Sequence, residues 1–141
     1  MDNSYLAGFF DGEGSVSLIR VGKSKSFQVV VAITNTDLTI LERIKEVFGG
    51  DIFKGKRIKS NHKERHVWRV SSKAAYTFLL EIYPYSLMKQ ERIKLALKFQ
   101  QRIINRNGLK DRVHLTEEEH LLRLDYKKKM TLLNKKGIIT A

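Results

Sequence analysis

The chain has no cysteine among its 141 residues and only one proline. Without cysteine it can form no disulfide, no thiolate metal site and no cysteine nucleophile, so any metal must be held by oxygen or imidazole. No apolar run approaches the roughly 18 residues of a membrane-spanning helix. The first residues, Met1–Ser4, also lack the basic and apolar character of an export signal. We therefore expect an intracellular protein that is neither secreted nor membrane-bound.

Acidic residues are scarce relative to basic ones. The chain has 15 Asp and Glu against 27 Lys and Arg, which gives a formal net charge of +12. Such an excess attracts polyanions, so nucleic acid is the first partner to expect. Hydrophobic residues make up 42% of the chain and charged residues 30%, as is typical of a globular protein. The length fits a single domain over residues 1–141.

Apolar residues recur with helical or strand periods along the chain. Ser4 can cap a short helix over Tyr5–Phe10, which the glycines that follow it are expected to end. Alternation predicts two hairpins, with strands at 15–21 and 27–35 and then at 51–56 and 65–71. Further helices are expected over about 37–48, 72–83, 90–105 and 116–137. The order αββαββα with helical additions at the C-terminal end, over 90–105 and 116–137, indicates an α+β fold, in which helices back an antiparallel sheet.

Gly8 lies in the first predicted helix, and Gly12 stands four positions later on the same helix face, just past the expected end. This spacing permits a second helix to approach closely, but it is best documented in membranes, and in a soluble protein the simpler explanation is a helix packed on the chain's own sheet. Glu13 follows directly. If a two-fold axis ran beside this helix, two copies of the Glu13 carboxylate would meet, and paired carboxylates bind divalent metal ions such as Mg²⁺. The alternative is that Glu13 is a simple turn residue.

The segment Leu6–Gly14, LAGFFDGEG, resembles the signature of the LAGLIDADG homing endonuclease family position by position. The predicted element order agrees with that family's fold, which has a saddle-shaped antiparallel sheet. After Gly55 only two glycines remain, so the 141 residues hold no second glycine-paired copy of the signature. The resemblance therefore implies a single-motif, homodimeric member of the family, whose dimer interface contains Gly8 and Gly12.

The resemblance also implies an activity. The protein would make a metal-dependent double-strand break in a long, roughly palindromic DNA target, across the minor groove, leaving short 3′ overhangs. Glu13 and the Gly12 carbonyl would bind Mg²⁺ or Mn²⁺, whereas Asp11 would satisfy backbone amides near helix ends. Lys89 and Asn35 resemble the residues that organise solvent in the active sites of homodimeric members. A plain surface role for Lys89, and a turn or capping role for Asn35, stay open as alternatives.

Strand alternation predicts which side chains face DNA. If Phe27, Val29, Val31 and Ile33 face the core, an opposite set faces outward. That outward set comprises Ser15, Ser17, Ile19, Gln28, Val30, Ala32, Lys54, Lys56, Arg65, Val67 and Arg69. Arg69 and Gln28 are the candidates for base contacts, because arginine pairs with guanine and glutamine with adenine in the major groove. The basic loop at 57–63 is expected to contact phosphates.

Three other functions fit parts of the sequence. An intron maturase would share the signature and bind RNA. A DNA-binding regulator of the same fold without nuclease activity would be expected to lose the acid that Glu13 retains. A basic ribosome-associated RNA-binding protein would not require the glycine-spaced segment at all. The sequence does not distinguish an organelle from an archaeal or other cytoplasm as the host compartment.

Overall fold

The structure, a computed structural model, describes residues 2–23, 26–55, 64–107 and 116–139. Its elements are α1 (Asn3–Glu13), β1 (Gly14–Arg20), β2 (Phe27–Asn35), α2 (Leu38–Phe48), β3 (Asp51–Lys54), β4 (His66–Ser71), α3 (Ser72–Ile82), a 3₁₀ turn η1 (Tyr83–Tyr85), α4 (Gln90–Asn107) and α5 (Glu117–Ile139). The predicted order αββαββα is confirmed, and two further helices, α4 and α5, follow it where helices over 90–105 and 116–137 were predicted. Within the described ranges, no helix is both long and apolar enough to cross a membrane.

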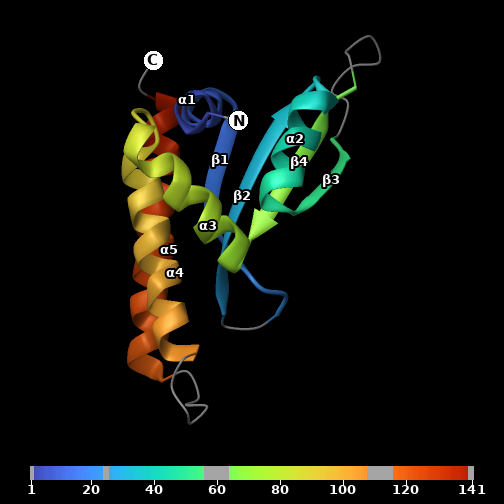
Figure 1. The fold of residues 1–141 in the computed structure, drawn as a ribbon. Coiled ribbons are helices and arrows are strands. Elements are labelled where there is room, and N and C mark those ends of the chain that lie inside the picture. Colours follow the sequence, from blue (N-terminus) through green and yellow to red (C-terminus); the bar gives the residue numbers. More distant parts are fainter. Residues whose placement is uncertain (1, 24–25, 56–63, 108–115, 140–141) are drawn as a thin grey trace.

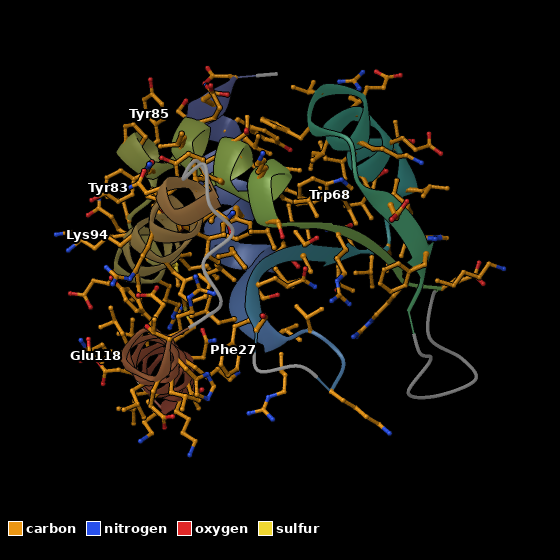
Figure 2. All side chains as sticks on the ribbon, turned by 90° about the horizontal axis from the view of Figure 1, so that it is seen from below. Phe27, Trp68, Tyr83, Tyr85, Lys94 and Glu118 are labelled. Atoms are coloured by element: carbon orange, nitrogen blue, oxygen red, sulfur yellow. The ribbon has the colours of Figure 1, made fainter. Side chains whose placement is uncertain are left out.

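The four strands form one antiparallel sheet in the order β1-β2-β4-β3. Figure 1 shows α3 crossing one face of this sheet, with α4 and α5 running side by side in opposite directions next to it. The core lies between that face and the helices. Val29, Val31 and Ile33 of β2 have no exposed surface, as their alternation predicted. Trp68 of β4, which is labelled in Figure 2, packs against Phe78 of α3, with ring centroids 5.1 Å apart.

Helix α1 is longer than the sequence predicted. Its N-cap is Asp2, not Ser4, because the Asp2 carboxylate accepts a hydrogen bond from the Ser4 amide at 2.7 Å. The helix also runs through Gly12 to Glu13 instead of ending at Phe10. A helical glycine costs only about 1 kcal/mol, and the buried side chains of the helix outweigh that cost: Leu6, Ala7, Phe10 and Asp11. Glu13 is therefore the last helical residue, immediately before β1.

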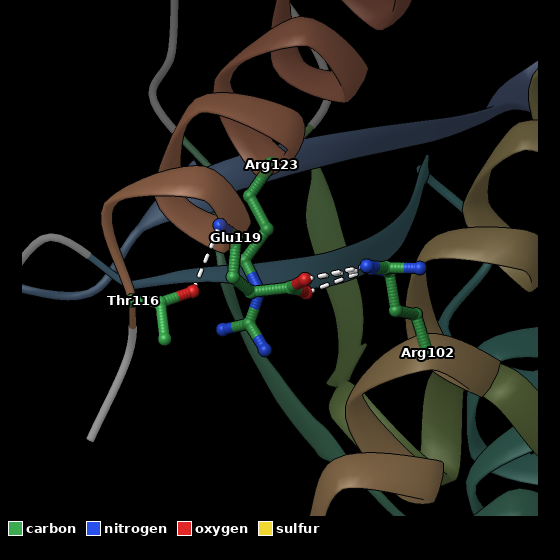
Figure 3. Close-up of polar contacts among 4 residues, drawn as sticks. All are labelled: Arg102, Thr116, Glu119 and Arg123. Carbon is green, nitrogen blue, oxygen red and sulfur yellow. Dashed lines mark hydrogen bonds and ion pairs between the residues drawn. The ribbon is translucent and has the colours of Figure 1, made fainter. Parts of the chain in front are cut away.

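A buried ion network fixes α5 to α4 (Figure 3). The Glu119 carboxylate, 3% exposed, accepts hydrogen bonds from Arg102 at 2.6–3.0 Å and from Arg123 at 3.1 Å. The hydrogen bonds from Arg102 do most to hold the pKa of Glu119 below its ordinary value. Thr116 caps the helix by accepting from the Glu119 amide, as predicted. Helix α5 continues past Gly137, its predicted end, to Ile139.

Side chains of α5 also cover the outer edge of the sheet. Lys127 donates to the carbonyl of Leu18 at 2.7 Å, and Asn134 donates to that of Val16 at 3.3 Å. Both carbonyls belong to β1, which is an edge strand. An uncovered edge offers backbone groups to strands of other chains. Because α5 occupies these two carbonyls, this part of the β1 edge is closed to such pairing.

Candidate functional site

Glu13 lies at a hollow of about 420 Å³ beside the end of α1. The hollow is lined by Gly12, Glu13, Gly14, Thr34, Asn35, Thr36 and Arg65. Glu13 and Gly12 are both exposed. The last carbonyls of a helix have no following helical amides to accept from, and they carry the negative end of the helix dipole. An exposed carboxylate beside such carbonyls makes an oxygen-rich corner of the kind that attracts a hard cation.

The buried Asp11 carboxylate holds the end of α1 against the start of α4. It accepts a hydrogen bond from the Ser86 hydroxyl at 2.5 Å and from the amides of Leu87, Met88 and Lys89 at 2.8, 3.1 and 3.2 Å. Burial alone would raise the pKa of Asp11, but these hydrogen bonds outweigh burial and lower it below its ordinary value. Asp11 thus has the structural position that the sequence predicted, turned away from solvent and bonded to amides.

We expect Asp11→Asn to lower the free energy of unfolding by about 2–4 kcal/mol at pH 7. The asparagine oxygen cannot accept all four hydrogen bonds, and the asparagine NH₂ group, itself a donor, would face the donors that now bond to the carboxylate. A lowered native pKa stabilises the fold above the unfolded pKa, near 3.8, and this stabilisation is lost as the pH falls. In urea unfolding, the difference in the free energy of unfolding between the unaltered protein and Asp11→Asn should therefore be constant near neutrality and shrink below about pH 4.

Asp37→Asn, at the exposed N-cap of α2, is the control, since asparagine caps equally well. A difference independent of pH would contradict this account of Asp11.

Lys89 is placed at the C-terminal end of α1, although it lies 76 positions after Glu13 in the chain. Its ammonium group donates to the Asp11 carbonyl and lies 5.9 Å from the centroid of the Phe10 ring. Burial lowers the pKa of Lys89 and the charge of Arg92 lowers it further, while Asp11 and Glu13 oppose them. Lys89 is therefore a half-buried lysine close to Glu13, hydrogen-bonded to the Asp11 carbonyl, and not a free surface lysine.

Asn35 ends β2 at the same hollow as Glu13. Its side-chain oxygen accepts a hydrogen bond from the Asp37 amide at 2.8 Å, which forms a turn ahead of α2. The turn role that the sequence left open is therefore present. This bond leaves the amide nitrogen of Asn35 as the group that can serve a ligand in the hollow.

The two glycines of α1 lie on its exposed side. A Cβ atom built at Gly8 or Gly12 meets no atom of the described residues within 4 Å. Tyr5, one turn earlier on the same helix, is 58% exposed. Packing among the described residues therefore gives no reason for either glycine, and the interpretation that they serve the chain's own sheet loses its support.

The predicted outward face of the sheet is largely where the alternation placed it. Arg65 and Arg69 are exposed, as are Ser15 and Ile19, whereas Ser17, Gln28, Ala32 and Val67 are half-buried. Val30 points to this face, but it is only 4% exposed, because it sits on a central strand with neighbours on both sides. A direct base contact by Val30, as the alternation suggested, does not fit that burial.

Lys54 is on the other face of the sheet, contrary to the prediction. Its cross-strand partner is His66, and the pair two positions earlier, Ile52 with Trp68, lies on the same, core-facing side. Lys54 instead forms an ion pair with Glu64 at 3.2 Å. The residues that β3 does present outward are Asp51, opposite Arg69, and Phe53, which is opposite Val67 and 46% exposed. Lys56 and the loop at 57–63 lie outside the described residues.

The described residues of one chain do not by themselves build a complete metal site. No cluster of three His, Asp or Glu side chains suited to a metal occurs in the part of the chain that the structure describes. Glu13 is thus a single carboxylate with carbonyls beside it. Further ligands would have to come from water, from a phosphate or from a second copy of the chain.

Comparison with known proteins gives matches in sequence and in structure. A family model described as LAGLIDADG endonuclease matches residues 6–103. The chain is 36% identical over 72 residues to the intron-encoded RNA maturase bI4 of Saccharomyces cerevisiae. That match covers 46% of this chain but only 11% of the maturase.

Three solved structures share the fold. The homing endonuclease I-CvuI in complex with its target has a TM-score of 0.68 at 20% identity, over 93% of this chain and 80% of its own. The archaeal intron-encoded homing endonuclease I-Vdi141I complexed with DNA has a TM-score of 0.68 at 22% identity, over 93% of this chain and 82% of its own. The homing endonuclease I-LtrWI bound to target DNA has a TM-score of 0.66 at 25% identity, over 92% of this chain but 44% of its own.

Proposed function

The chain belongs to the LAGLIDADG endonuclease family, and we propose that it is a site-specific DNA endonuclease that acts as a homodimer. One observation carries the proposal: an exposed carboxylate, Glu13, ends a helix whose exposed side holds two glycines. Packing of two such helices would bring two Glu13 carboxylates together at a two-fold axis. Each subunit would contact one half of a roughly palindromic target of about 20 base pairs, since half-sites lie about one helical turn apart.

Two copies of this chain account for features that one copy leaves unexplained. The glycines of α1 leave room for a backbone to approach, and a second chain would meet this one there and not at the part of β1 whose carbonyls α5 occupies. The shared fold extends over 80% of I-CvuI but only 44% of I-LtrWI. The I-LtrWI chain therefore has room for a second unit of the same size, which this chain would obtain by dimerisation.

The residues at the hollow fit a hard divalent cation, Mg²⁺ or Mn²⁺. Glu13 offers a carboxylate and Gly12 a carbonyl, and Mg²⁺ commonly binds one or two carboxylates together with water and phosphate oxygens. When bound, such an ion supplies positive charge against the phosphate and makes nearby water a better nucleophile. The chain's own groups then orient that water. Lys89 brings a cation close to Glu13, and Asn35 offers its amide at the hollow.

Arg65 is the cation that lines the hollow together with Glu13. Its guanidinium is suited to two hydrogen bonds with a phosphate. We expect Arg65→Ala to slow single-turnover cleavage about 10- to 100-fold at saturating protein, because a donor to the charge that develops on the phosphate is lost. Arg69→Ala, on the same face but outside the hollow, should instead weaken binding and leave the saturated rate unchanged. Equal rates for Arg65→Ala and the unaltered protein would rule out this role.

The outward sheet face is proposed to enter the major groove. A two-stranded or broader antiparallel ribbon fits this groove, and Arg69 presents an exposed guanidinium there. The net charge of +12 favours binding to phosphates. Half-buried Gln28 is the second candidate for a base contact, although its side-chain oxygen lies 3.5 Å from the Ser72 hydroxyl, which donates to it.

RNA binding is a second candidate function, favoured by the identity shared with the maturase bI4. The test of the main proposal is selection of cleaved duplexes from a randomised DNA library in Mg²⁺, in parallel with EDTA. A roughly palindromic consensus that is cut only in Mg²⁺ supports the endonuclease. Bound but intact duplexes would support a non-cleaving regulator, and retention of structured RNA without DNA selection would support the maturase.

A further inference from the structure

The open face of the sheet carries an apolar row next to the hollow. The cross-strand pairs Thr34 with Val67 and Val67 with Phe53 place three side chains abreast on β2, β4 and β3. Thr34 also lines the hollow that contains Glu13. The row therefore begins at the candidate active site and runs across the sheet to its outer edge.

The row is accessible to a ligand. Phe53 is 46% exposed, and Thr34 and Val67 are half-buried. Phe53 stands on β3, the edge strand, on the face turned away from Trp68 and the core. An exposed phenylalanine at this position contributes little to the packing of the fold. It is available for contact with a partner on the open face.

The chemistry of the row limits which base edges it can recognise. Val67 and Phe53 have no polar group, and the Thr34 side chain offers one hydroxyl beside a methyl group. None of them can make the paired hydrogen bonds by which guanine or adenine is recognised. The thymine 5-methyl group is the one apolar feature on the major-groove edges of the bases. The adjacent row differs, because it holds Arg69 between Ala32 and Asp51.

We infer that Thr34, Val67 and Phe53 recognise thymine by its 5-methyl group, so that each half-site carries T·A pairs close to the cleavage site. This inference rests on the proposed function, since it requires the open face to lie in the major groove. It also gives a physical basis for preferring DNA over RNA, because uracil lacks the methyl group.

The experiment uses the full chain and the duplex selected from the library. Each thymine in turn is replaced by deoxyuridine, which removes the methyl group and keeps every hydrogen-bonding group. The dissociation constant is measured for the unaltered protein, Phe53→Ser and Val67→Ser. For the unaltered protein, we expect one to three substitutions per half-site to weaken binding about three- to five-fold each. Phe53→Ser or Val67→Ser should abolish the penalty at the matching thymine.

Controls separate this inference from the proposed function. Arg69→Ala should keep the deoxyuridine penalties, since it belongs to the adjacent row, and a thermal melt confirms that each variant is folded. The inference is overturned if no deoxyuridine weakens binding, or if the penalties persist in both serine variants, while specific cleavage continues. Failure to select any duplex would overturn the proposed function and this inference together.

Discussion

Glu13→Gln is expected to slow DNA cleavage by at least about 1,000-fold, with affinity for the target kept within about three-fold. The glutamine amide has nearly the shape of the carboxylate but no charge, so it binds a divalent cation poorly. Glu13 is exposed, and the substitution removes no packing from the core. Single-turnover cleavage in Mg²⁺ measures the rate, and a gel-shift assay in Ca²⁺ measures the affinity.

The matched control for this experiment is Glu118→Gln, the same change at an exposed position of α5 (Figure 2). It should cleave at the normal rate. A Glu13→Gln protein that cuts normally would remove Glu13 from the reaction. A variant that loses binding as well as cleavage would instead place Glu13 in DNA recognition.

Gly8→Leu is expected to weaken the dimer by about 5- to 150-fold, because a side chain at a close helix crossing forces the two helices apart. Inside one chain the same position is open, since an added Cβ meets nothing described within 4 Å. Gly8→Ala should accordingly raise the intrinsic helix stability by about 1 kcal/mol. Sedimentation equilibrium gives the dimer constant, and thermal unfolding at low concentration gives the stability of the monomer.

A side chain at Gly8 is expected to weaken the dimer without destabilising the monomer only if α1 lies at the dimer interface. Glu46→Leu, which adds the same side chain at an exposed position of α2, is the control and should leave the dimer constant unchanged. A Gly8→Leu protein that stays dimeric with unchanged affinity would show that the subunits meet elsewhere. Cleavage by Gly8→Leu should fall together with the dimer fraction, because the proposed site needs both copies of Glu13.

Most elements followed from local patterns in the sequence, and the exceptions have tertiary causes. The hairpin from β1 to β2 came from plain alternation, which burial on one face makes reliable. The extent of α1 did not, because Gly12 looked like a helix end and only the packing of Phe10 and Asp11 keeps it helical. Lys54 was placed on the wrong face because a strand's register depends on its partner. Ile52 and Phe53 are both apolar, so alternation alone does not decide which of them faces the core until Ile52 is paired with Trp68 of β4.

The candidate site was only partly visible in the sequence. Glu13 and the glycines lie within one short segment, so a local pattern could identify them. Lys89 reaches the same corner only because Asp11 accepts hydrogen bonds from the amides before α4. Arg65 was predicted to face DNA, but nothing local placed it in the hollow with Glu13. Phe53 was missed, because a single phenylalanine in a short strand gives no sign of its face until pairing with Val67 is known.

Native mass spectrometry of the protein on its selected duplex tests the central claim most directly, because it weighs the complex before and after Mg²⁺ is added. We predict a complex of two chains per duplex in EDTA. With Mg²⁺ it should give two double-stranded fragments whose masses place one break in each strand. A complex with one chain per duplex, or a two-chain complex whose duplex keeps its full mass in Mg²⁺, would contradict the account.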